Sequence, residues 1–207
     1  MTQQLIFPIV VHAQEGFTYT NHPSVGNIGE YVDPNKPSLN LIEPSYGEPL
    51  FPTKYFTKAG EDGYFNPEDI NGLLELEEFD SEEKLDLEII LLGGELYRCM
   101  RESFRIISQW ESKTHFLNRT TVRIPHNGAF DLNRHGDKKP LFLEDMVKKQ
   151  GFVMSFCMEY CFYWGLDGQL NFLDKEIEFK FKKRPWGAFL EGEMFHPYEM
   201  SGSYAMP

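Results

Sequence analysis

The chain has few cysteines, no long apolar run and no excess of positive charge. Among its 207 residues the cysteines are Cys99, Cys157 and Cys161, an odd and low number that argues against a disulfide scaffold and favours a reducing compartment. The N-terminal apolar run, Leu5 to Val11, is interrupted by Pro8 and follows no basic residue. It is also far shorter than the roughly 20 residues of a membrane helix. We therefore expect a cytoplasmic protein with no secretory signal and no membrane partner.

The sequence also lacks the excess of basic residues that is typical of nucleic-acid-binding proteins. Its formal net charge is −12 and its pI is near 4.9, so nucleic acid and acidic lipid surfaces would both repel it. The hydrophobic share of 41% and the aromatic share of 15% are sufficient for a sizeable core, which argues against global disorder. The length predicts a single domain over residues 1–207, and the negative net charge favours a protein partner with a basic surface. The alternative is that the acidity serves only solubility.

The negative charge is concentrated between Glu61 and Glu95. This segment holds thirteen acidic residues and one lysine, so it carries the whole net charge of the chain. Its acids could be the solvated side of ordinary helices, or they could form a docking face for a basic partner, with Tyr64, Phe65 and Phe79 as anchors. We take the docking face as the functional hypothesis. The acids that would contact the partner are Glu75, Glu77, Glu78, Asp80, Glu82, Glu83, Asp86 and Glu88.

Prolines and helix signals distinguish the first two regions of the chain. Residues 1–60 are rich in Pro, Gly, Asn and aromatic residues, which predicts an extended, loop-rich N-terminal region. Residues 61–113 are predicted to be acidic and helical, because Asn66-Pro67 has the pattern of a helix start. Apolar residues at intervals of three or four then form a helical stripe, namely Leu96, Met100, Phe104, Ile107 and Trp110.

The third region, residues 114–207, is predicted to be an antiparallel meander. Residues 120–124 indicate a short strand, and residues 141–149 a short helix. Strict alternation over residues 152–164 indicates a long strand, and alternation over residues 176–182 a half-exposed one. The predicted class is therefore α+β: a central helical segment packed on a mainly antiparallel C-terminal sheet, with an extended N-terminal region rich in proline and aromatic residues.

One short motif bears on catalysis. Arg134-His135-Gly136, followed by two lysines after Asp137 and then by Pro140, resembles the Arg-His-Gly-x-Arg-x-Pro signature of histidine phosphatases. In that family the histidine accepts a phosphoryl group and the arginine holds it. Here the residues before the motif are too polar for a buried parallel strand, and lysine stands in place of the second arginine. We interpret the match as a structural loop.

The wider loop, residues 126–137, is the alternative site if the protein is an enzyme. Its histidines and carboxylates are of the types that perform acid–base chemistry or bind metals. They are His126, Asp131, Arg134, His135 and Asp137. The sequence contains neither the His-Glu-x-x-His signature nor paired Cys-x-x-Cys motifs, and no phosphate-binding glycine loop or dinucleotide fingerprint. We therefore predict no catalytic residue, no metal and no cofactor.

The sequence thus favours a non-enzymatic protein that binds and occludes a basic partner, such as a toxin-neutralising immunity protein or another inhibitor. Two alternatives remain open at this point. One is a structural or assembly component whose N-terminal region wraps a neighbouring protein. The other is a hydrolase with its site in the 126–137 loop.

Overall fold

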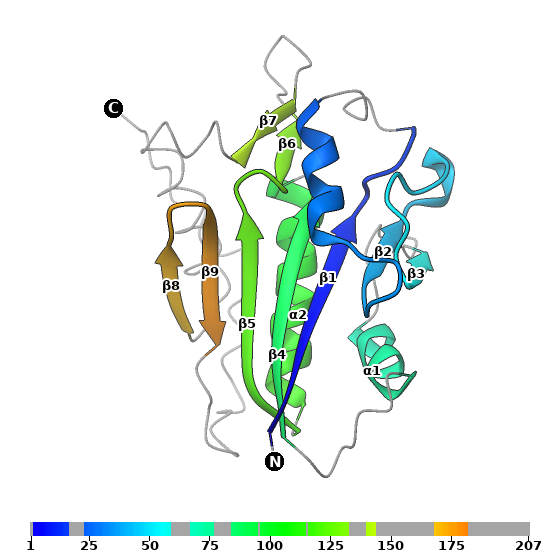
Figure 1. The fold of residues 1–207 in the computed structure, drawn as a ribbon. Helices are drawn as coiled ribbons and strands as arrows, with labels where there is room; N and C mark the ends of the chain where they lie inside the picture. Colours follow the sequence, from blue (N-terminus) through cyan, green and yellow to red (C-terminus); the bar gives the residue numbers. More distant parts are fainter. Residues whose placement is uncertain are drawn as a thin grey trace, which may run out of the picture.

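The chain folds around one large mixed β-sheet. The computed structural model describes residues 2–16, 23–58, 67–76, 84–94, 96–114, 116–132, 140–143 and 168–181. Within these ranges seven strands form a sheet in the order β3-β2-β1-β4-β5-β9-β8 (Figure 1). In that order the strands are Tyr55–Lys58, Leu39–Ile42, Thr2–Val11, Lys84–Gly93, Leu117–Pro125, Glu176–Phe181 and Gly168–Phe172. A separate antiparallel pair consists of β6, Phe130–Leu132, and β7, Pro140–Phe142.

The first five strands of the chain run parallel to one another. β1 pairs with β2 and with β4, β2 pairs with β3, and β4 pairs with β5. The β8–β9 hairpin then extends the sheet in the antiparallel sense, because β9 pairs with β5. The order β3-β2-β1-β4-β5 is that of a doubly wound α/β sheet, in which the strand order reverses beside the first strand. The reversal, or topological switch point, lies between β1 and β4.

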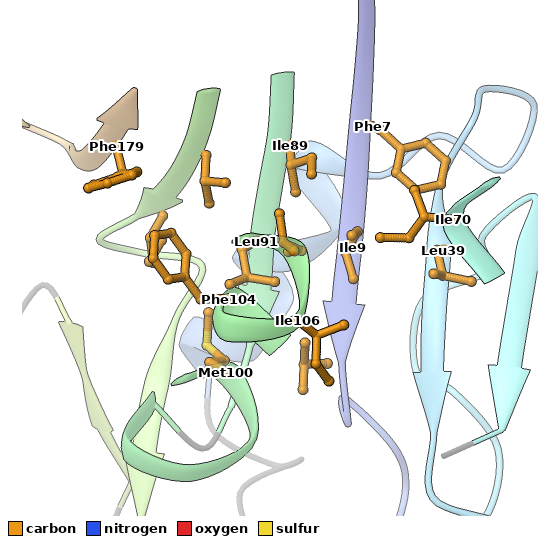
Figure 2. Close-up of a cluster of buried hydrophobic side chains, with 14 of the residues drawn as sticks. Phe7, Ile9, Leu39, Ile70, Ile89, Leu91, Met100, Phe104, Ile106 and Phe179 are labelled. Carbon is orange, nitrogen blue, oxygen red and sulfur yellow. The ribbon is translucent and has the colours of Figure 1, made fainter. Parts of the chain in front are cut away.

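Two α-helices cover one face of the sheet. They are α1, Pro67–Leu76, and α2, Arg101–Lys113, which continues a π-helical turn, η3, Leu96–Met100. Side chains of both helices share the main core with alternate residues of β1 and β4, including Ile9 and Ile89. Figure 2 shows Met100, Phe104 and Ile106 within this core, beside side chains of the strands. Burial of this apolar surface is the main stabilising contribution to the fold.

The opposite face is covered at one end by a 3₁₀ helix, η1, Pro23–Tyr31 (Figure 1). A second, smaller core joins this helix to Val10, Leu92 and Phe130 through Val25 and Ile28. The carboxyl half of β4 is therefore buried on both faces, which explains its continuous apolar sequence. A short 3₁₀ turn, η2, Pro44–Tyr46, lies between β2 and β3.

The predicted α+β class, with a helical segment on a mainly antiparallel C-terminal sheet, is wrong. Residues 1–60 are not merely extended and loop-rich, because they supply β1, β2 and β3, and β1 is the middle strand of the parallel part, β3-β2-β1-β4-β5. Residues 61–113 are not wholly helical, because β4 lies between α1 and α2. Four of the six strand pairings in the large sheet are parallel. Among the described strands, antiparallel pairing occurs on the β5–β9–β8 side of that sheet and in the β6–β7 pair.

Several local predictions are confirmed. The stripe from Leu96 to Trp110 is buried along η3 and α2, and α1 begins at Pro67. β9 is antiparallel, with Ile177 and Phe179 buried on one side. Within the described ranges no helix is long and apolar enough to span a membrane. The predicted strand at residues 152–164 and most of the predicted helix at residues 141–149 lie outside the described residues, although β7 occupies the start of the latter.

Candidate functional site

The carboxyl ends of β1 and β4 meet at the switch point, which is where doubly wound sheets commonly bind ligands. Val11 and Gly93 are paired at this edge. The Gly94 amide donates to the Val11 carbonyl at 3.1 Å, and the Gly93 amide donates to the Gly128 carbonyl at 2.8 Å. The turn that follows β5 is thus hydrogen-bonded directly to the end of β4.

The glycines at this edge allow close packing. Gly93 has a φ of 97°, and a Cβ atom there would lie 2.1 Å from the Val11 carbonyl oxygen. At Gly94 a Cβ would lie 2.1 Å from the ring of Phe130, which is fully buried. No side chain fits in either space. The backbone of β1 and the ring of Phe130 therefore pack directly against the end of β4.

His12 lies directly after β1, and sequence analysis did not select it. Its φ of 51° is in the left-handed region, and its amide donates to the Leu41 carbonyl at 3.1 Å. Burial lowers the pKa of its imidazole to about 4, although the negative charge of Glu43 opposes this shift. At neutral pH the imidazole is uncharged and suits a packed position. The only sequence signal was a histidine at the end of an apolar run.

His126 is the one residue of the alternative catalytic set whose side chain the structure describes. It is buried directly after β5, and its amide donates to the Lys175 carbonyl at 2.9 Å. Asp131 lies in β6, but its side chain is outside the described part. Arg134, His135 and Asp137 lie outside the described residues altogether. The structure therefore does not test whether this set comes together.

The turn after β5 is also attached to η1. The Tyr31 hydroxyl, at the end of η1, donates to Asn127 Oδ1 at 2.7 Å. Burial raises the pKa of Tyr31, so the phenol stays protonated and able to donate. This contact joins residues 96 positions apart in the sequence.

A charged network crosses the neighbouring strands. Arg123 on β5 donates through Nε to both carboxylate oxygens of Glu176 at 2.9 Å and through Nη1 to Glu88 Oε1 at 2.5 Å. The two carboxylates raise the pKa of Arg123 further above its usual value. Beside it on β9, an ion pair with Lys180 lowers the pKa of Glu178. These contacts tie β4, β5 and β9 together.

The acids predicted to dock a partner are only partly placed by the structure. Asp86 and Glu88 alternate with buried residues of β4, and Asp86 accepts a hydrogen bond from Asn118 at 2.7 Å. Glu88 is engaged by Arg123. Both point away from the sheet face that α1 covers, so the acids do not form one continuous helical face. The side chain of Glu75, in α1, is not described, and Glu77, Glu78, Asp80, Glu82 and Glu83 lie outside the described residues.

Within the described ranges no group of three or more His, Cys, Asp or Glu side chains is arranged to hold a metal ion. Comparison of the chain with protein-family models, with curated proteins and with solved structures found no match.

Proposed function

We propose that the chain is a non-enzymatic protein that binds and occludes a basic protein partner. The observation that carries the proposal is the distribution of charge. Residues 61–95 carry the whole net charge of −12, and the remainder of the chain is neutral. Such a concentration produces a local negative field that accelerates association with a basic protein and discriminates against acidic ones.

The arrangement of the switch point supports binding rather than catalysis. In doubly wound sheets the space beyond the carboxyl ends of the strands is where substrates and cofactors lie. Here the end of β4 is packed closely by the chain itself, because the Phe130 ring lies against Gly94 and the Gly93 amide donates to the Gly128 carbonyl. A protein that acts through its surface does not require an open crevice at this position.

The structure also changes which acids we expect to matter. Glu88 already neutralises part of the charge of Arg123, so its loss would perturb the sheet as well as any docking surface. The acids between α1 and β4 are the better choice for a test. We expect the reversal of Glu77, Glu78, Glu82 and Glu83 to lysine to slow association with the partner, because it reverses four charges of the acidic segment. Circular dichroism and thermal unfolding of the variant check that the fold is retained.

The partner is first captured by cross-linking in an extract of the native cell and identified by mass spectrometry. Association kinetics are then measured with that purified protein at low and high salt. We expect the on-rate of the wild type to fall as salt rises and that of the fourfold reversal to be low throughout.

A matched control reverses four acids outside the segment, Glu15, Glu30, Glu48 and Asp174, which are exposed in the structure. It changes the net charge by the same amount, so it separates a local docking surface from a general effect of charge. An on-rate that responds equally to both fourfold variants would contradict the proposal.

A hydrolase with its site in the 126–137 loop is the second candidate. The observation that favours it is the position of His126 at the carboxyl end of β5, on the edge where ligands bind in this class of sheet. If partner binding is the activity, His126→Gln and His135→Ala should both retain it. Loss of activity in either variant with unchanged thermal stability would favour the enzyme.

A further inference from the structure

η1 and the turn after β5 lie together over the switch point. η1 crosses the carboxyl ends of β1 and β4 (Figure 1). Val25 and Ile28 of this helix pack on Val10 of β1 and Leu92 of β4. Phe130, the first residue of β6 after the turn, belongs to the same small core and is fully buried. Two segments distant in sequence thus cover one region of the sheet.

η1 has few local features that stabilise a helix. Its nine residues are assigned as 3₁₀ helix, whereas 3₁₀ runs longer than three or four residues are uncommon because their hydrogen bonds have poor geometry. It includes Gly26, where a Cβ atom would have no neighbour within 4 Å, and Gly29. Glycine adds conformational entropy to the open state, so little local propensity holds this helix closed.

A side-chain hydrogen bond links the two covering segments. The Tyr31 hydroxyl donates to Asn127 Oδ1 at 2.7 Å. The turn is also bound to the end of β4, because the Gly93 amide donates a hydrogen bond to the Gly128 carbonyl. The Tyr31–Asn127 hydrogen bond therefore connects η1 to a turn that is itself hydrogen-bonded to the sheet.

We propose that η1 is a lid over the switch point, latched by Tyr31 to Asn127, and that it opens while the sheet stays folded. Opening uncovers the apolar carboxyl ends of β1 and β4, with Val10, Leu92 and Phe130. The lid is independent of the acidic segment, so this proposal stands or fails separately from the proposed function.

The test is native-state hydrogen exchange of backbone amides in the full chain, with Tyr31→Phe and Asn127→Ala. Each variant removes the same hydrogen bond and should raise the exchange rate of residues 25–31 about fivefold, as expected for the loss of one ordinary hydrogen bond. Amides in the middle of β4 should be unchanged. The double variant should show no further increase, because both changes remove one interaction.

Asn71→Ala provides a matched control. It removes a bond of the same length from an aromatic donor to an asparagine Oδ1, that between Trp110 and Asn71, on the opposite face of the sheet. It should leave exchange in residues 25–31 unchanged. The lid is disproved if the backbone amides of residues 25–31 exchange as slowly as those in the middle of β4. It is also disproved if neither latch variant alters their exchange.

Discussion

Arg123 on β5 lies between two carboxylates, and its Nη1 atom donates to Glu88 of β4 at 2.5 Å while its other nitrogens bind Glu176 of β9. The Arg123 side chain is only partly exposed, at 34%. Replacing it by methionine keeps the bulk but leaves two carboxylates without their cation. We expect Arg123→Met to lower the free energy of unfolding by about 1–3 kcal/mol. Arg123→Lys should lose less, although lysine cannot reproduce the forked contact. Urea denaturation measures both changes, and equal stability of wild type and Arg123→Met would show that the network contributes nothing.

The second prediction concerns Gly93. Alanine there would place a Cβ atom 2.1 Å from the Val11 carbonyl oxygen, at a φ of 97° that side chains rarely adopt. We expect Gly93→Ala to destabilise the protein by more than about 2 kcal/mol, since both a backbone clash and backbone strain are introduced. Gly26→Ala is the control, because a Cβ atom there meets nothing within 4 Å. Thermal unfolding should show a large loss for the first variant and little change for the second.

The third prediction concerns the pH dependence that His12 contributes. Its folded pKa of about 4 lies below the unfolded value of 6.5, so the unfolded chain binds the proton more readily in that window. The stability due to neutral His12 is complete above pH 6.5 and declines as the pH falls toward 4. The total loss should be about 3 kcal/mol. His12→Asn suits the positive φ and removes the titration. The difference in stability between wild type and variant should therefore change over this window, and a constant difference would contradict the assignment.

The fourth prediction concerns Thr120, which is fully buried in β5. Its hydroxyl oxygen has no hydrogen-bond partner among the described residues. Valine has the same shape and removes the cost of burying an unpaired hydroxyl. Thr120→Val should therefore raise the free energy of unfolding by about 1 kcal/mol. A decrease measured by denaturant titration would mean that the hydroxyl is paired in solution.

The sequence predicted elements whose pattern is local. The stripe from Leu96 to Trp110 has helical spacing and one buried side, so the helix follows directly from it. β9 could likewise be recognised because Ile177 and Phe179 alternate with charged residues. In both cases the residues that face the core and those that face solvent differ clearly in polarity.

Of the strands that the sequence did not predict, β1 and β4 were missed for identifiable reasons. β1 contains Pro8, and a proline normally argues against a central strand. It is tolerated because β2 pairs with β1 only from Ile9 onward, so Pro8 has a ladder partner on one side alone. The first half of β4 carries Asp86 and Glu88 among apolar residues, and that acidity suggested the surface of a helix.

The candidate site was less predictable than the helices. The importance of Gly93, Gly94 and His12 depends on which strands become neighbours, and the parallel pairing of β1 with β4 joins segments about 80 residues apart. No local pattern encodes such a pairing. The hydrogen bond between Tyr31 and Asn127 has the same origin, since it forms only after the sheet has brought η1 beside the turn.

The central position of β1 has a consequence for synthesis on the ribosome. β1 precedes all its partners in the chain, yet its neighbours are β2 and, starting at Lys84, β4. During translation, the backbone hydrogen-bonding groups on both sides of β1 stay unpaired until β2 and β4 have been synthesised. During that interval the apolar stretch from Leu5 to Val11 is available for intermolecular strand pairing, a recognised route to aggregation. Pro8, within that stretch, cannot donate a backbone hydrogen bond and so makes it a poorer template for another chain.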